Sequence, residues 1–79
     1  PCVINGKTVP HLVIQGQHGP VTILLMPFEH VEEATPFDGE NVHGLIVPVG
    51  DGSIAIVGDR AEELEPIRES VVGSVTWTI

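Results

Sequence analysis

Aromatic residues are nearly missing from this 79-residue chain, which has no Tyr, one Trp and two Phe. Hydrophobic residues still make up 42%, close to the globular average, which argues against disorder. The core must therefore be aliphatic, and its many Val and Ile residues favour strands. A chain this short forms one small domain at most, so residues 1–79 are expected to fold as a single unit.

Basic residues are also few, because three Lys and Arg stand against eleven Asp and Glu, for a net charge of −8. Nucleic-acid binding needs Lys and Arg to neutralise phosphates, so nucleic acid is excluded as a partner. No apolar run approaches the roughly 20 residues that span a bilayer, so the domain itself is not expected to insert into a membrane. A protein partner or a small ligand stays open. A basic or cationic one is allowed, although an excess of acid more often serves only solubility.

The chain has a single cysteine and therefore no internal disulfide. Packing or association must stabilise so small a fold, and a homodimer is one of the alternatives. The chain also opens with Pro1 rather than an initiator Met. We therefore expect a domain excised from a longer protein, or a processed start.

Turn residues divide the first third of the chain into strands. Asn5-Gly6 suits a tight turn and predicts a hairpin between the short strand before it and residues 7–15. Pro10 cannot donate to a ladder, so residues 7–15 should form an edge strand or carry a bulge. A four-residue loop then makes residues 20–26, which are apolar on both faces, the antiparallel neighbour in a central position.

Residues 27–34 are expected to form a short helix. Pro27 suits the first position of a helix. Phe28 and Val31 are three residues apart and would face the core together. Pro36 would end the helix, because the residue before a proline avoids the α region.

A second hairpin and a second helix are predicted in the later half. Residues 42–50 and 53–58 flank Asp51-Gly52, the strongest hairpin signal in the chain. Asp59 then has the character of a helix cap, with Glu62 at capping-box spacing. The carboxylates of this helix should lie on its exposed side; they are Glu62, Glu63, Glu65 and Glu69.

The apolar face of this second helix combines residues at helical spacing, namely Ala61, Leu64, Ile67 and Val71. Pro66 would kink the helix and Gly73 would end it. Residues 74–79 alternate in polarity and predict a last strand whose core face includes Trp77. The predicted fold is α+β: a small, mostly antiparallel sheet of five to six strands with one kinked helix packed on one face.

Candidate chemistry centres on Cys2, His11 and His18. A hairpin could bring the Cys2 thiol near His11, and a thiolate beside an imidazole is a nucleophile or a metal site. The spacing of the histidines does not follow a zinc pattern, however, and a free Cys usually behaves as a small hydrophobe. The favoured interpretation is therefore that these residues are structural, with metal or redox sensing through Cys2 and His11 kept as an alternative.

Motifs of enzymes are not found. No glycine-rich stretch precedes a helix in the dinucleotide or P-loop pattern, and no Ser lies in a nucleophile elbow. The chain is therefore expected to be non-enzymatic and to use no cofactor. A structural dimerisation domain is the remaining alternative.

The order of several short motifs resembles a proteobacterial family of uncharacterised proteins described as candidate anti-sigma regulators. The resemblance covers nearly the whole chain and rests on Cys2, His11 to Val13, Gly19 to Thr22, Met26-Pro27, Gly52 to Gly58 and Trp77. It implies a domain that follows a single membrane-spanning segment and lies at the periplasmic face of the inner membrane. It also implies a sensory or regulatory binding role, and it carries no catalytic residues.

Overall fold

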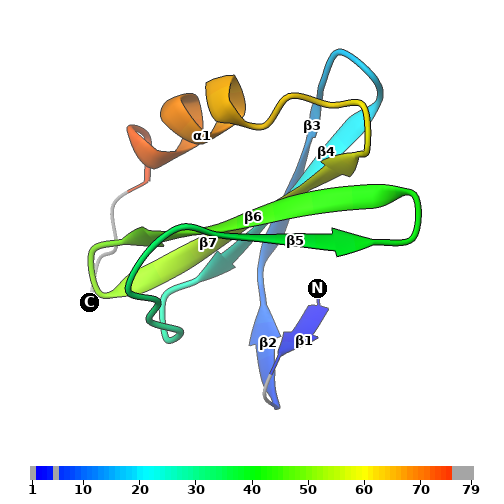
Figure 1. The fold of residues 1–79 in the computed structure, drawn as a ribbon. Coiled ribbons are helices and arrows are strands. Elements are labelled where there is room, and N and C mark those ends of the chain that lie inside the picture. Colours follow the sequence, from blue (N-terminus) through cyan, green and yellow to red (C-terminus); the bar gives the residue numbers. More distant parts are fainter. Residues whose placement is uncertain (1, 5, 76–79) are drawn as a thin grey trace.

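The structure is a computed structural model that describes residues 2–4 and 6–75. Seven strands are followed by one helix (Figure 1). In chain order they are β1 (Cys2–Ile4), β2 (Lys7–Val9), β3 (His11–Gln15), β4 (Pro20–Met26), β5 (Thr35–Gly39), β6 (Val42–Val49), β7 (Gly52–Asp59) and α1 (Glu65–Val72).

Five of the strands form one antiparallel sheet in the order β3-β4-β7-β6-β5. The first two strands form a separate hairpin, in which Ile4 lies opposite Lys7. This confirms the hairpin predicted at the first turn dipeptide. The pairing of β3 with β4 is also confirmed, and it places β3 at one edge of the sheet and β4 inside it.

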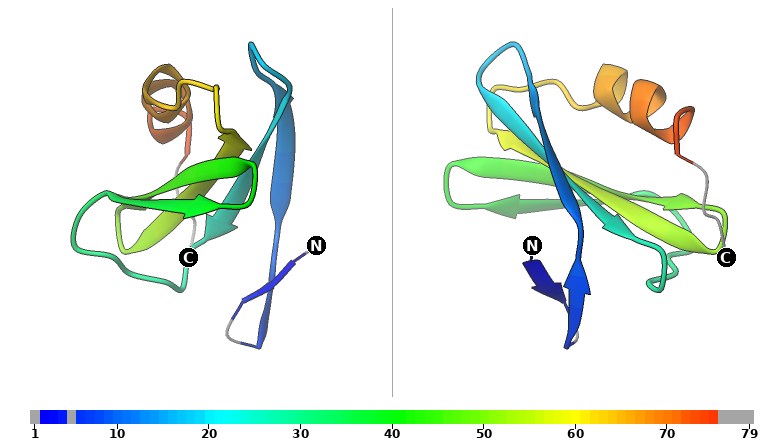
Figure 2. Two further views of the ribbon diagram at one scale, coloured as in Figure 1. Left: turned by 45° about the vertical axis from the view of Figure 1, so that its right-hand side comes forward. Right: turned by 180° about the vertical axis from the view of Figure 1, so that it is seen from behind.

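Pro10 separates β2 from β3 and so ends the small hairpin. The carbonyl oxygen of Pro10 accepts a hydrogen bond from the Leu25 amide at 3.0 Å, which keeps the chain against β4 at this point. Because Pro has no N–H, Pro10 can accept a hydrogen bond from β4 here but cannot donate one in return. β3 continues along the path of β2, from the small hairpin into the sheet (Figure 2).

The hairpin between β6 and β7 is confirmed, but its turn lies one residue earlier than predicted. Val49 pairs with Gly52, so the turn residues are Gly50 and Asp51. Gly50 has φ 57°, in the left-handed region that glycine adopts without a steric penalty. The turn before β6 uses Asn41 in the same way, with φ 61°.

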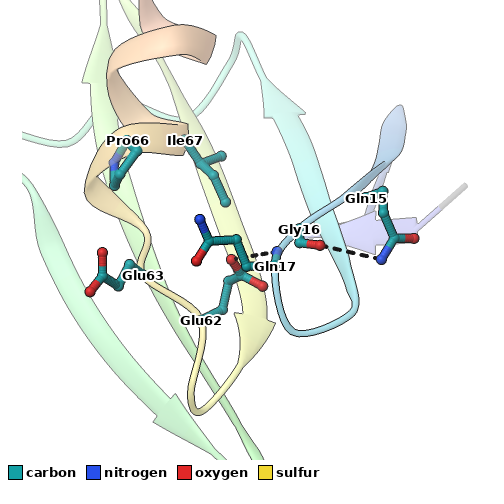
Figure 3. Close-up of a pocket in the computed structure, with 7 residues that line it drawn as sticks. All are labelled: Gln15, Gly16, Gln17, Glu62, Glu63, Pro66 and Ile67. Atoms are coloured by element: carbon teal, nitrogen blue, oxygen red, sulfur yellow. Dashed lines mark hydrogen bonds between the residues drawn. The ribbon is translucent and has the colours of Figure 1, made fainter.

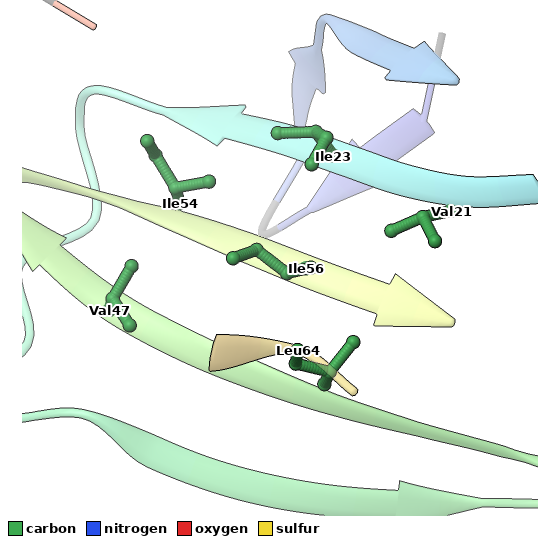
Figure 4. Close-up of a cluster of buried hydrophobic side chains, with 6 residues drawn as sticks. All are labelled: Val21, Ile23, Val47, Ile54, Ile56 and Leu64. Atoms are coloured by element: carbon green, nitrogen blue, oxygen red, sulfur yellow. The ribbon is translucent and has the colours of Figure 1, made fainter. Parts of the chain in front are cut away.

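One face of the sheet is covered by α1, and the main core lies between them (Figures 2 and 4). The buried side chains of this core are all aliphatic; they are Val21, Ile23, Val47, Ile54, Ile56 and Leu64. Ile67 and Val71 of α1 pack against them. Alternation along β4 and β7 sends these side chains to one face, as the period of a strand requires.

The opposite face, which we call the open face, carries a smaller cluster. Its buried members are Val9, Met26 and Ala55, and Phe28 and Ile46 are among the partly buried side chains packed against them. Val9 comes from β2, so the N-terminal hairpin covers one end of this face. The central strands are therefore apolar on both sides.

The prediction of an α+β domain with a kinked helix is wrong, because the structure is mostly antiparallel sheet with one short helix. The helix has eight residues and begins at Glu65, not at Asp59. Pro66 lies in its first turn and does not kink it. A proline ring clashes with the carbonyl four residues earlier, so a helix from Asp59 through Pro66 would be costly, whereas Pro66 is tolerated in the first turn of a helix that begins at Glu65.

Residues 59–62 form a turn instead of the predicted helix start. The Asp59 side chain accepts a hydrogen bond from the Ala61 amide at 2.9 Å. The Asp59 carbonyl accepts another from the Glu62 amide, also at 2.9 Å. Asp59 therefore stabilises the turn that redirects the chain from β7 towards α1.

The helix predicted for residues 27–34 is also wrong, because this segment consists of turns and irregular structure. Eight residues between two prolines are too few to offset the cost of helix nucleation unless packing supports them. Phe28 nevertheless reaches the smaller cluster, as the prediction required of a core residue. Of the last strand predicted for residues 74–79, Ser74 lies in a turn and Val75 packs against the main core, whereas residues 76–79, with Trp77, lie outside the described residues.

Among the residues that the structure describes, no helix is long and apolar enough to cross a membrane.

Truncation of the central core residue should be costly. Ile56 is fully buried in the main core, so Ile56→Ala should lower the free energy of unfolding by about 2–5 kcal/mol through lost burial and a residual cavity. Leu12→Ala is the control, because the Leu12 side chain is 55% exposed, and its effect should stay within about 0.5 kcal/mol. Urea denaturation at low protein concentration measures both, and equal losses would contradict the placement of the core.

Candidate functional site

The predicted metal or redox residues lie in three different elements. Cys2 is in β1, opposite Val9. His11 begins β3, and His18 lies in the loop beyond the other end of that strand. Over residues 2–4 and 6–75, no group of three His, Cys, Asp or Glu side chains is arranged to hold a metal ion.

The other histidines make local contacts. His43 lies on β6, half-buried, and its Nε2–H donates to the Glu62 carbonyl oxygen at 2.7 Å. His30 is exposed and lies 3.4 Å from the Glu32 carboxylate. These contacts fix one turn and one loop.

Glu62 is the most deeply buried charged residue described, with 4% of its surface exposed. Its two carboxylate oxygens accept hydrogen bonds from the backbone amides of Gln17, at 3.0 Å, and His18, at 2.8 Å. These amides belong to the loop between β3 and β4, 44 or more residues away in sequence. Glu62 therefore fastens this loop to the turn that follows β7 (Figure 3).

The approach of Glu62 to the loop depends on a glycine. A Cβ atom at Gly16 would overlap the Glu62 carboxylate and would lie 2.8 Å from a methyl of Val21. Any side chain at this position would push the carboxylate away from the two amides. The expectation that Glu62 lies on the exposed side of a helix is thus wrong, because no helix includes it.

Hydrogen bonding holds Glu62 in its ionised form. The His18 amide contributes most to lowering the pKa of Glu62 below its ordinary value, and the Gln17 amide adds to it, whereas burial acts in the opposite direction. A carboxylate with a lowered pKa and both oxygens engaged is a poor proton acceptor. A hollow of about 260 Å³ beside it is lined by Glu63, Pro66 and Ile67 among others, but its central carboxylate is already used for structure.

A larger hollow, of about 320 Å³, opens on the open face of the sheet. Its lining is mainly apolar and comes from β4, β5, β6, β7 and the segment before β5: Leu24, Met26, Glu29, Val31, Phe37, Ile46, Ser53 and Ala55. The strand register explains the grouping, since Ala55 lies opposite both Leu24 and Ile46. The volume is at the lower end of the range for small-molecule sites.

Phe37 forms one wall of this hollow because Gly44 leaves room for its ring. The two residues are opposite one another in β5 and β6, and a Cβ at Gly44 would overlap the ring. The ring can therefore lie close to the sheet. A glycine inside a strand often marks such a close approach.

Ser53 adds a polar group to this mainly apolar lining, which also includes Glu29. Its side chain is fully buried, and its hydroxyl has no hydrogen-bond partner among the described residues. Ser53 lies opposite Met26, so both belong to the face on which the hollow opens. A buried hydroxyl without a partner costs about 1–3 kcal/mol, and a bound group with a donor or acceptor would recover this once neighbouring side chains moved to expose the hydroxyl.

The pH dependence of stability should report the Glu62 anchor. Because its folded-state pKa is lowered, Glu62 binds fewer protons in the folded than in the unfolded chain. Its contribution is therefore present above the unfolded pKa and is lost as pH falls through the folded pKa. In Glu62→Gln this part of the loss of stability in acid should disappear. The variant should also be less stable than the wild type at neutral pH.

Glu63→Gln is the matched control, because Glu63 is exposed and adjacent. The free energy of unfolding is measured by urea denaturation from neutral to acidic pH. Its dependence on pH should match the wild type in Glu63→Gln and should be weaker in Glu62→Gln. Identical slopes in the two variants would contradict the anchor.

Comparison with known proteins gives one match. A family described as "Protein of unknown function (DUF3379)" matches residues 1–75, which include every described strand and α1. No curated protein and no solved structure matches the chain. By the extent of the family match, the chain belongs to the DUF3379 family.

Proposed function

We propose that this chain is a non-enzymatic sensory or regulatory domain that binds an apolar ligand in the hollow on the open face. The observation that carries the proposal is the buried Ser53 hydroxyl without a partner in an apolar lining. Apolar walls bind by excluding water, and one polar group fixes orientation and specificity. The ligand is therefore an apolar group with a single hydrogen-bonding function.

The charge of the protein restricts the possible ligands further. The chain has a net charge of −8, and Glu29 stands among the lining residues. An anionic ligand would be repelled by this field, whereas a neutral or cationic one would not. We therefore expect a neutral or cationic ligand.

The non-enzymatic part of the proposal is supported by the state of the buried carboxylate. Glu62 is the charged side chain most withdrawn from water among the described residues, which is where a general base with a raised pKa would be sought. Its pKa is shifted in the opposite direction by two backbone amides. Its chemistry is that of an anchor.

We further propose that the domain is the periplasmic part of a membrane-anchored anti-sigma regulator. The support is the resemblance of its motifs to such proteins, and two of these motifs lie at the hollow. Met26 and the Gly52 to Gly58 stretch, with Ser53 and Ala55, lie on neighbouring strands that line the hollow.

Ligand binding should depend on the Ser53 hydroxyl. Benzyl alcohol should shift the amide signals of Met26, Ser53 and Ala55 in two-dimensional NMR spectra, and it should bind more tightly than toluene because it can pair with the hydroxyl. One hydrogen bond of about 0.5–1.5 kcal/mol corresponds to a preference of about two- to tenfold. Ser53→Ala should abolish this preference and keep toluene binding.

Ser70→Ala serves as the control for the titration, because Ser70 is exposed on α1 and its removal should leave the preference intact. Shifts scattered over the surface, or a preference for benzyl alcohol that survives in Ser53→Ala, would refute the proposed site.

The location of the domain has a separate test. In the full-length protein, alkaline phosphatase joined after residue 79 should be active, because this enzyme needs the oxidising periplasm to form its disulfides. β-Galactosidase joined at the same point should be inactive. The reverse pattern would reject a periplasmic position without bearing on the hollow.

A further inference from the structure

The exposed apolar surface of the molecule is concentrated on one strand. Among the described residues, three large hydrophobic side chains are exposed: Leu12 at 55%, Val13 at 59% and Ile14 at 39%. All three lie in β3, which is an edge strand of the sheet (Figure 2). Single exposed apolar residues are ordinary, but three in sequence on a free edge are a pairing surface.

The backbone of β3 has a defined set of outward groups. The Gly16 amide donates to the Gly19 carbonyl at 2.8 Å, and the Leu25 amide donates to the Pro10 carbonyl at 3.0 Å. Hydrogen-bonded and non-hydrogen-bonded pairs alternate along an antiparallel ladder. In the register of β3 with β4, Leu12 and Ile14 therefore bond to β4, whereas the amides and carbonyls of His11, Val13 and Gln15 point away from the sheet.

The other edge of the sheet is protected in ways that β3 is not. β5 contains Pro36, which cannot donate to an added strand. It also contains Asp38, whose carboxylate lies 3.7 Å from the Arg60 guanidinium. The sequence of β3, HLVIQ, has no charged residue of this kind and no proline. Charges and prolines on edges prevent unwanted pairing, so their absence from the β3 sequence leaves this edge open to a partner strand.

We propose that β3 pairs antiparallel with β3 of a second copy of this chain, around a two-fold axis at Val13. In this register Val13 lies opposite Val13 of the second copy, and His11 lies opposite Gln15. The outward amides and carbonyls of His11, Val13 and Gln15 then all find partners across the axis. Leu12 lies opposite Ile14 of the second copy, so the exposed apolar side chains bury one another.

The chemistry of β3 favours a second copy over a different protein. The strand is self-complementary in this register, and two-fold dimers are the commonest closed assembly. A basic partner would gain nothing from β3 itself, which contains no Asp or Glu. The net charge of −8 on each copy opposes association at long range, so salt should strengthen the dimer by screening.

This inference is independent of the proposed ligand site. The lining of the hollow includes no residue of β3. Loss of dimerisation would therefore leave ligand binding in place, and failure of ligand binding would leave the dimer in place.

The test is sedimentation equilibrium from about 10 µM to about 1 mM protein, at low and at moderate salt. The wild-type chain should pass from monomer to dimer over this range, at lower concentration when salt is added. Val13→Lys places a charge at the axis, where two copies would meet, and should weaken the dimer by about tenfold or more. Ser70→Lys makes the same charge change on exposed α1 and should dimerise as the wild type does.

Amide hydrogen exchange gives the register. At low concentration the amides of Leu12 and Ile14 should be protected and those of His11, Val13 and Gln15 should exchange fast. At high concentration all five should be protected. A wild-type monomer at about 1 mM in salt, a dimer unaffected by Val13→Lys, or continued fast exchange of the three outward amides would each overturn the proposal.

Discussion

One short helix has to cover a sheet that is apolar on both faces. β4 and β7 send Val21, Ile23, Ile54 and Ile56 to one face and Met26 and Ala55 to the other. The eight residues of α1 cover only the first of these faces. The second is covered at one end by Val9 and along part of its area by Phe28. The hollow is the uncovered remainder, so it follows from the imbalance between sheet and helix.

The position of α1 depends in turn on Glu62. The chain leaves β7 at the turn of residues 59–62, and the carboxylate of Glu62 joins this turn to the loop at the far end of β3 and β4. The two amides offset the desolvation of the buried charge, and the anchor fixes the direction in which the chain continues to Leu64 and α1. The position of Glu62 requires a glycine at residue 16, because any Cβ there would overlap the carboxylate.

Local signals in the sequence predict the hairpins and fail where distant residues decide. The turn dipeptide at Asn5-Gly6 and the loop after Gln15 predict their hairpins because the information lies within a few residues. The turn after β6 is shifted by one residue, since Gly50 can take the left-handed position as well as Gly52 can. These differences are small and leave the strand order unchanged.

The helices and the candidate sites could not be predicted in this way, because they depend on residues that are distant in the sequence. Asp59 and Glu62 match a capping box in spacing, but Pro66 decides against a helix there, and the burial of Glu62 depends on Gly16 far away in sequence. Ser53 cannot be recognised from the sequence as a buried hydroxyl, because its surroundings come from β4 and β6. The edge at β3 does carry a local signal, since HLVIQ has no charge and no proline to protect it.

The excess of acidic residues affects both candidate surfaces, although β3 contains no acid and the lining of the hollow contains only Glu29. Two of the three bases are already paired, Arg60 with Asp38 at 3.7 Å and Arg68 with Glu65 at 3.3 Å. The remaining carboxylates give the molecule a negative field that keeps it soluble and repels anions. β3 is free of carboxylates, and the hollow has only Glu29 among its lining residues. Apolar contact can therefore act at these two places at short range. Salt screens the long-range repulsion and so decides how closely another acidic molecule approaches.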